Sequence, residues 1–295
     1  MAEDNKTFDE ENSELIDYPY ISAQDLMFRV IEYIEARYKS PDKDVLKTDS
    51  PYLYFEKDDL VVLASRPGMG KTAFVLSLIS QLVLKKQIPV GFAVPDWPEE
   101  EIGAKLLSIN TGVPISKIRS GMLKVDDVKK IQEAAKQFFE APFYLFNEPN
   151  CNFHAIKKQV INMAMENHIQ LLIVDGFEYL QDIIDSDEKN YRITLTYLLS
   201  EFKRLSVELH IPIILVMDIP KSKHDNEPTL LDFRRYTIIP DRADKVLFLH
   251  RDRSKIYTKC QTAELIIAKD NCGREGTIGM DYYPITGKFC WKQTV

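Results

Sequence analysis

Hydrophobic residues follow two alternating patterns over the first two-thirds of the chain. Short continuous apolar runs, rich in β-branched residues, predict buried strands over residues 60–64, 89–94, 143–146, 170–175 and 211–217. Between these runs, apolar residues recur at helical spacing and predict helices over residues 99–110, 125–139, 153–166 and 190–209. Strands that alternate with helices in this way are typical of a parallel sheet covered by helices on both faces.

The last third of the chain has a different pattern. Strands are predicted over residues 245–250, 263–269, 277–283 and 288–291, with turns at 271–273 and 284–287. This late run of strands favours an antiparallel extension at one edge of the sheet. We therefore expect an α/β fold with a mostly parallel sheet and antiparallel edge strands.

The first fifty residues differ from the rest. Residues 1–20 contain seven acidic residues against Lys6 and lack apolar periodicity, which predicts a disordered acidic tail. Residues 22–38 have helical apolar spacing, with Ser22 as the cap and Ser40-Pro41 after the end. This apolar face either packs on its own domain or docks on a neighbouring subunit. We expect a tail over 1–20, a helix and loop over 21–50, and one domain over 51–295.

A phosphate-binding loop is predicted directly after the first buried strand. The sequence SRPGMGKT at 65–72 lies between that strand and a long apolar run that we interpret as a buried helix. Strand, glycine-containing turn, Gly-Lys-Thr and helix together form the context of a P-loop, although Ser65 stands where the pattern has Gly. An ordinary strand–turn–helix corner is the alternative. The predicted nucleotide-binding residues are Arg66, Pro67, Gly68, Met69, Gly70, Lys71 and Thr72.

Charge and metal chemistry at this loop follow from its side chains. Lys71 is expected to neutralise the β- and γ-phosphates of ATP, and the Thr72 hydroxyl to hold Mg²⁺. Asp175 ends a later apolar strand, in the position of a Walker B acid that holds the same ion. An aspartate that ends a strand is by itself more often a turn former. In combination with the P-loop, we predict that Asp175 and Thr72 form the metal site.

Composition excludes several classes of protein. No run approaches the roughly 18 uncharged apolar residues of a membrane span. The first residues lack the basic-then-apolar pattern of a secretory signal, so we expect a cytoplasmic protein without membrane contact. The four cysteines lack metal-site spacing and are expected to be reduced thiols. The net charge of −7 comes mostly from residues 1–20, so the bulk charge neither indicates nor excludes a nucleic-acid partner.

Several blocks of sequence resemble the RecA-like ATPase domain of the DnaB-type replicative DNA helicases. They include ASRPGMGKTAF at 64–74, ISKIRSGML at 115–123, LLIVDGFEYL at 171–180 and ELIIAKDNCGREGT at 264–277, all in the order of that family. The resemblance implies a RecA-like P-loop core that works as a hexameric ring around single-stranded DNA. The helix over 22–38 looks like the family's linker helix, which packs on the adjacent subunit. We expect the family's N-terminal helical domain to be missing.

The sequence departs from this family at its catalytic positions. Family members have a Glu that polarises the attacking water, but here Pro95 stands in its place, with Asp96 as the nearest acid. Lys269 matches the family's Lys-Gln-Arg motif, whose Arg acts on the neighbour's ATP. Asn271 occupies that Arg position, and Arg274 is the nearest replacement. Either Asp96 and Arg274 take over the roles of the missing Glu and Arg, or the loss of both groups leaves ATP hydrolysis close to nil.

Further departures concern the γ-phosphate and DNA. Glu178 and Asp218 stand where family members have Gln, and the second of these Gln residues senses the γ-phosphate. Residues 181–190 contain four acids and one lysine, whereas a loop that follows a phosphate backbone is expected to be basic. The sequence therefore gives only weak support for the binding of single-stranded DNA. This support comes from a few basic residues in and just beyond the next loop: Lys221, Lys223, Arg234 and Arg235.

Two functional hypotheses follow, and both involve ATP, Mg²⁺ and a homo-oligomer. The first is a DNA-stimulated ATPase and helicase with Lys71, Asp96 and Arg274 as its catalytic residues, its hydrolysis weak or impaired. The second is a ring or scaffold that binds nucleotide without hydrolysis and regulates or recruits a protein partner.

Overall fold

The computed structural model describes residues 21–95, 97–187, 189–220, 226–233, 237–252 and 258–292. The chain divides into two compact units, Met1–Lys43 and Asp44–Val295. The larger unit begins inside the segment 21–50 that the sequence assigns to a helix and loop. The reason is local pairing, since strand β1 (Val45–Lys47) pairs antiparallel with strand β2 (Tyr54–Glu56). The predicted acidic tail lies outside the described residues.

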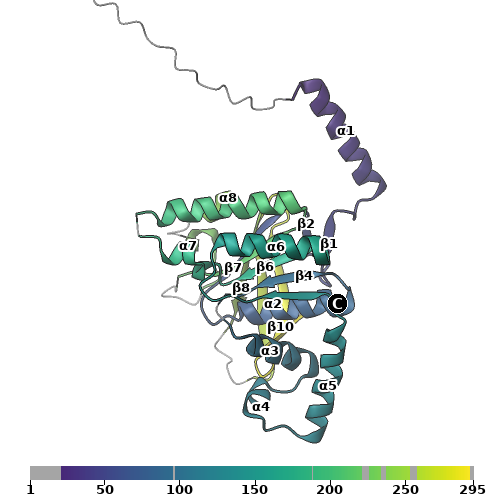
Figure 1. Ribbon diagram of the computed structural model, residues 1–295, viewed down its shortest axis with the longest axis vertical. Coiled ribbons are helices and arrows are strands. Elements are labelled where there is room, and N and C mark those ends of the chain that lie inside the picture. Colours follow the sequence, from purple (N-terminus) through teal and green to yellow (C-terminus); the bar gives the residue numbers. More distant parts are fainter. Residues whose placement is uncertain are drawn as a thin grey trace, which may run out of the picture. The chain divides into compact units, whose positions relative to one another are not determined.

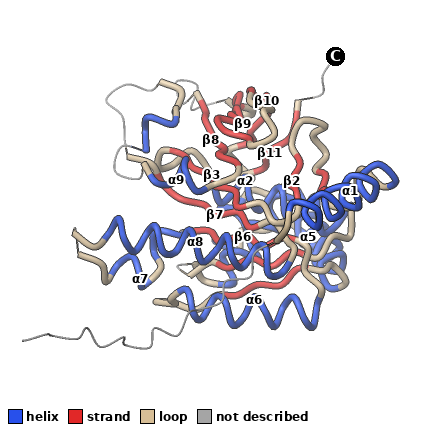
Figure 2. Tube along the Cα trace, turned by 90° about the horizontal axis from the view of Figure 1, so that it is seen from above, coloured by secondary structure: helices blue, strands red, loops and turns tan. Residues whose placement is uncertain are grey.

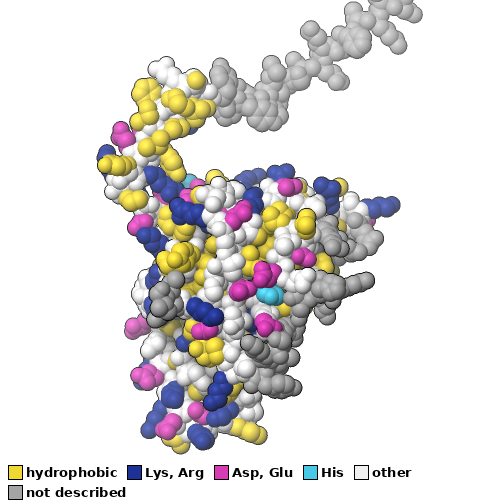
Figure 3. Space-filling model, turned by 180° about the vertical axis from the view of Figure 1, so that it is seen from behind, with side chains coloured by type: hydrophobic (Ala, Val, Ile, Leu, Met, Phe, Trp, Pro, Cys, Tyr) yellow, Lys and Arg dark blue, Asp and Glu magenta, His cyan; other side chains and the backbone are white. Residues whose placement is uncertain are grey.

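The described part of the smaller unit contains helix α1 (Ala23–Lys39), which confirms the helix predicted over 22–38. The Ser22 hydroxyl caps this helix by accepting a hydrogen bond of 3.1 Å from the Asp25 N–H. No residue of α1 is buried. Apolar side chains cover much of this helix in Figure 3, and the exposed ones are Leu26, Met27, Phe28, Val30, Ile31, Tyr33, Ile34 and Tyr38. An apolar face of this size needs a cover.

A nine-stranded sheet forms the centre of the larger unit, with the order β11-β10-β9-β8-β3-β7-β6-β4-β5 (Figure 1). Its strands are β3 (Leu60–Ser65), β4 (Val90–Ala93), β5 (Phe143–Phe146), β6 (Leu171–Asp175), β7 (Ile213–Asp218), β8 (Lys245–Arg251), β9 (Gln261–Asp270), β10 (Gly276–Tyr283) and β11 (Lys288–Trp291). Strands β3 to β8 pair in parallel, and β9 to β11 continue the sheet antiparallel. The predicted fold class, a RecA-like core with antiparallel edge strands, is confirmed.

Helices cover both faces of this sheet (Figures 1 and 2). They are α2 (Lys71–Ser80) with a π-helical end (Gln81–Lys85), α3 (Glu99–Thr111), α4 (Ile115–Ser120), α5 (Val125–Phe139), α6 (Phe153–Asn167), α7 (Gln181–Ile184), α8 (Tyr191–Leu209) and α9 (Ile238–Arg242). The predicted helices agree with α3, α5, α6 and α8 to within one residue at each end. The segment 181–190, which we interpreted as a loop, begins with the short helix α7.

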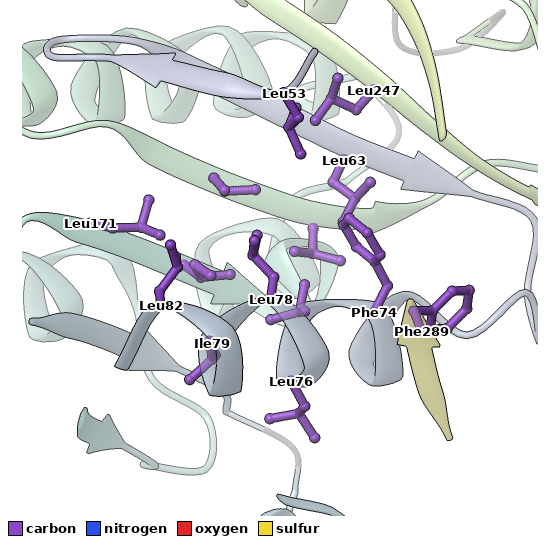
Figure 4. Packing of buried hydrophobic residues seen from close by; sticks show 14 of the residues in the cluster. Leu53, Leu63, Phe74, Leu76, Leu78, Ile79, Leu82, Leu171, Leu247 and Phe289 are labelled. Atoms are coloured by element: carbon purple, nitrogen blue, oxygen red, sulfur yellow. The ribbon is translucent and has the colours of Figure 1, made fainter. Parts of the chain in front are cut away.

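Strand β3 explains why the first apolar run is continuous. Its side chains enter two hydrophobic cores alternately: Val61 and Leu63 pack with α2, whereas Leu60, Val62 and Ala64 pack with residues of α6 and α8. Figure 4 shows Phe74, Leu78 and Leu82 of the α2 segment beneath the sheet. A strand buried on both faces is therefore apolar along nearly its whole length, and in β3 only the last residue, Ser65, is polar.

The parallel strands also fix where a site can lie. The carboxyl ends of β3, β6 and β7 meet at one edge of the sheet, because β3 pairs with β7 and β7 with β6. In open α/β sheets, ligands bind at this edge. Across the described ranges, no helix is both long enough and apolar enough to span a bilayer.

Candidate nucleotide-binding site

The loop between β3 and α2 has the geometry that a phosphate-binding loop requires. Gly68 and Gly70 have φ angles of 80° and 98°, a backbone conformation that favours glycine. Gly70 precedes α2 and provides no side-chain cap, so the first N–H groups of the helix have no acceptor within it. The positive end of α2 and its N–H groups are therefore available to an anion at the loop.

Arg251 of β8 holds this loop from behind. Its Nε donates to the Met69 carbonyl and its Nη2 to the Gly68 carbonyl, each at 2.9 Å, while Nη1 donates to Gln261 Oε1 at 2.6 Å. The C=O and N–H of a trans peptide point in opposite directions. Because the Met69 carbonyl points at Arg251, the Gly70 N–H points away from it. Arg251 thus positions the loop for an anion on the opposite side.

Arg251→Met is expected to weaken ADP binding by about tenfold, because the loop loses two charge-assisted hydrogen bonds that fix its peptide orientation. Calorimetric titration of the folded variant with Mg-ADP measures this change. Arg242→Met removes an exposed arginine of α9 and is the matched control. An Arg251→Met variant that binds ADP as tightly as wild type would contradict the positioning role.

The predicted metal ligands are close together. Thr72 donates a side-chain hydrogen bond to Asp175, which lowers the pKa of that carboxyl, but burial has the larger effect and raises it. Asp175 is 6% exposed, and its Oδ2 has no hydrogen-bond partner. A buried oxygen without a partner is costly unless something satisfies it. A hydroxyl and a carboxylate are ligands that Mg²⁺ prefers, so these residues fit the ion.

Lys71 forms an ion pair with Asp218 at the end of β7. The backbone N–H of Asp218 donates to Glu178 Oε1 at 2.9 Å. Burial raises the pKa of Glu178 to about 7, and the neighbouring Asp218 charge contributes in the same direction, whereas Lys71 opposes it. The lysine that the pattern assigns to phosphate thus lies in an acidic environment.

Sequence reasoning missed two residues of this region. Arg251 is the last residue of β8, and nothing in the neighbouring sequence shows that its side chain reaches the P-loop. Lys105 of α3 lies 4.3 Å from the Trp97 ring centre and 3.8 Å from Glu101. Burial lowers the pKa of Lys105, and Asp175 is among the acids that oppose this shift. In the sequence, Lys105 looks like an ordinary solvated helix lysine.

Other predicted residues have different surroundings. Arg66 is directed to a neighbouring loop, with Nη1 on the Asn226 carbonyl and Nη2 at 3.9 Å from Asp232. The Met69 side chain is buried, so its backbone is the part that can meet a ligand. Pro95 is buried two residues after the end of β4, whose Ala93 pairs with Val174 next to Asp175. Pro95 therefore lies at the same sheet edge as the metal site, and Asp96 lies outside the described residues.

Lys269 and Arg274 lie at the opposite edge of the sheet. Lys269, near the end of β9, pairs with Val246 near the start of β8, because β9 runs antiparallel to β8. Its Nζ donates to the Pro240 and Ala243 carbonyls at 2.7 and 2.6 Å. Arg274 is exposed, with its guanidinium 4.8 Å from the centre of the Tyr54 ring. Within one chain, these residues are not brought to the P-loop.

Solved structures with a similar fold include an ATPase domain with a TM-score of 0.78 and 20% identity over 92% of this chain and 99% of that one. A DnaB-like replicative helicase, described with its primase interactions, has a TM-score of 0.76 and 18% identity over 93% of this chain and 68% of that one. These similarities show the fold.

Sequence relatives point to the same family. The replicative DNA helicase DnaB of Treponema pallidum (strain Nichols) is 29% identical over 81% of this chain and 53% of its own length. A probable replicative DNA helicase of Trieres chinensis is 28% identical over 92% of this chain and 62% of its own length. This chain thus spans little more than half the length of these relatives. The model of the DnaB-like helicase C-terminal domain matches residues 45–290, so the chain belongs to that family.

Proposed function

We propose that this chain binds ATP with Mg²⁺ as a subunit of a DnaB-type ring and hydrolyses it weakly. The observation that carries this proposal is the loop of Gly68 to Lys71 beside Thr72 and its hydrogen-bond partner, the buried carboxyl group of Asp175. In this arrangement Lys71 and the backbone N–H groups bind the β- and γ-phosphates. Thr72 and Asp175 hold Mg²⁺, which neutralises phosphate charge when bound. Titration of the full chain with Mg-ATP and Mg-ADP tests the binding step.

The weakness of hydrolysis rests on Pro95 and Asn271. Pro95 cannot accept a proton from water, and Asn271 donates its Nδ2 to Asp244 Oδ1 at 3.0 Å instead of presenting a positive charge. Lys269 and Arg274 lie on an edge away from their own P-loop, as residues that act on a neighbour's nucleotide would. We keep Asp96 and Arg274 as candidate catalytic substitutes, together with Lys71.

A ring that regulates or recruits a protein partner is the second candidate. The acidic segment 181–190 favours it, because four acids against one lysine disfavour a DNA phosphate backbone. Single-stranded DNA remains a proposed ligand of the first candidate, since the relatives are named replicative helicases. Titration of labelled single-stranded DNA, at low and at physiological salt, discriminates the two. Salt-sensitive binding supports the helicase candidate.

Removing residues 1–38 is expected to convert the oligomer to a monomer, because the exposed apolar face of α1 would no longer cover a surface of the adjacent subunit. Light scattering measures the mass. Within α1, Phe28→Asp with Ile31→Asp should have the same effect, whereas Glu32→Gln with Glu35→Gln should leave the oligomer intact. If the truncated protein keeps the same oligomeric state, α1 does not hold the subunits together, and its apolar face packs on its own chain instead.

A further inference from the structure

Three acids surround the end of the P-loop lysine. Asp175 and Asp218 end the adjacent strands β6 and β7, where Asp175 pairs with Val216, and Glu178 follows β6 by three residues. Lys71 Nζ contacts the Asp218 carboxylate. The Lys71 side chain is 12% exposed and that of Asp218 is 33% exposed, so this ion pair lies at the mouth of the site.

Glu178 holds Asp218 in this position. Glu178 Oε1 accepts the backbone N–H of Asp218 at 2.9 Å, which fixes the last residue of β7 next to the loop. Glu178 Oε2 is buried and has no hydrogen-bond partner. The P-loop lysine is therefore already paired with a carboxylate of the protein, Asp218, and a second carboxyl group, that of Glu178, lies behind this carboxylate.

We propose that Asp218, held by Glu178, competes with the terminal phosphate for Lys71 and makes the site prefer a nucleoside diphosphate to a triphosphate. This inference rests on the proposed nucleotide-binding function of the same loop. A P-loop lysine reaches the β- and γ-phosphates. A diphosphate can occupy the β position while Asp218 keeps its place on the other side of Lys71. A triphosphate must displace Asp218 or place its γ-phosphate beside a like charge, which is unfavourable.

Glu178 acts on this preference in two ways. Its carboxyl group adds a second acid behind the γ position, and its hydrogen bond to the Asp218 N–H holds the end of β7 in place. Asp218→Asn and Glu178→Gln keep the size of each side chain and remove its charge. In wild type, the acidic groups destabilise mainly the triphosphate complex. We therefore expect both variants to strengthen mainly the binding of the triphosphate.

The experiment compares the affinities of Mg-ADP and of a Mg-bound, non-hydrolysable ATP analogue for the full chain. We expect wild type to bind ADP more tightly. Asp218→Asn should strengthen binding of the ATP analogue by about tenfold, the ratio that corresponds to about 1.4 kcal/mol, and change ADP binding by less than about threefold. Glu178→Gln should shift the ratio in the same direction. Glu208→Gln on α8, whose side chain is 52% exposed, is the control for a change in net charge.

The outcomes separate this inference from the proposed function. If wild type binds both nucleotides equally, or if Asp218→Asn strengthens both by the same factor, the site binds nucleotide but the preference is wrong. If neither nucleotide binds to wild type or to any variant, the proposed function is overturned and the preference with it. A selective gain for the triphosphate analogue in Asp218→Asn, absent in Glu208→Gln, supports the proposal.

Discussion

Lys71→Ala is expected to weaken nucleotide binding by more than about 100-fold, because the phosphates lose a charge-assisted contact of roughly 3 kcal/mol. The structure adds a second reason for a large effect. Without the lysine, Asp218 loses its ion pair, and the phosphates meet the Asp218 carboxylate without a cation between them. A fluorescent ATP analogue and its ADP counterpart measure the loss.

Lys85→Ala is the matched control for this change. Lys85 lies in the π-helical end of the same helical segment, with a 68% exposed side chain that pairs with Asp49 at 3.0 Å. An exposed pair of this kind contributes about 1 kcal/mol or less to stability. Equal nucleotide affinity in wild type and Lys71→Ala would show that the loop is an ordinary strand–turn–helix corner.

Turnover of ATP by wild type is expected to be far below that of a working helicase and largely indifferent to single-stranded DNA. A positioned base contributes about 10²–10⁴ in rate, and an arginine finger about 10³–10⁵. Both groups act in the transition state, so their absence lowers turnover and leaves nucleotide affinity unchanged. A phosphate-release assay with and without single-stranded DNA, at saturating Mg-ATP, measures turnover.

Pro95→Glu together with Asn271→Arg is expected to raise turnover by orders of magnitude, and each single change should give little. The strand register supports the first site, because Pro95 follows β4 at the edge where Asp175 ends β6. The second site lies in an exposed turn at the opposite edge, where an arginine can reach an adjacent subunit. In the proposed ring, each nucleotide site of the double variant would receive the Glu from its own subunit and the Arg from the adjacent subunit.

Asp96→Asn and Arg274→Ala provide the decisive comparison. Brisk hydrolysis by wild type that disappears in either variant would show that these residues replace the missing base and finger. The chain would then be a motor enzyme. Slow hydrolysis that neither variant changes agrees with a ring that binds nucleotide without using it rapidly.

Most of the fold could be predicted from the sequence, because apolar runs, helical periodicity and turn residues are patterns within short segments. The helix over 125–139 and the strands over 143–146 and 288–291 have the predicted limits. Continuous apolar runs indicated strands buried on both faces, and Gly-Lys-Thr between a strand and a helix indicated the P-loop. The pair β1–β2 and the helices α4, α7 and α9 were not predicted, because these segments are neither continuous apolar runs nor long enough for a helical period.

The contents of the site were decided by the tertiary structure. Lys71 and Asp218 are 147 residues apart, and Arg251 is 182 residues from Met69. They meet because the strand order places β7 and β8 on either side of β3, and periodicity within a segment contains no information on strand order. Lys269 and Arg274 lie at the other ends of the parallel strands, away from the P-loop, because β9 runs antiparallel to β8. The sequence by itself determined which residues form strands, helices and a phosphate loop; the order of the strands decided which charges face that loop.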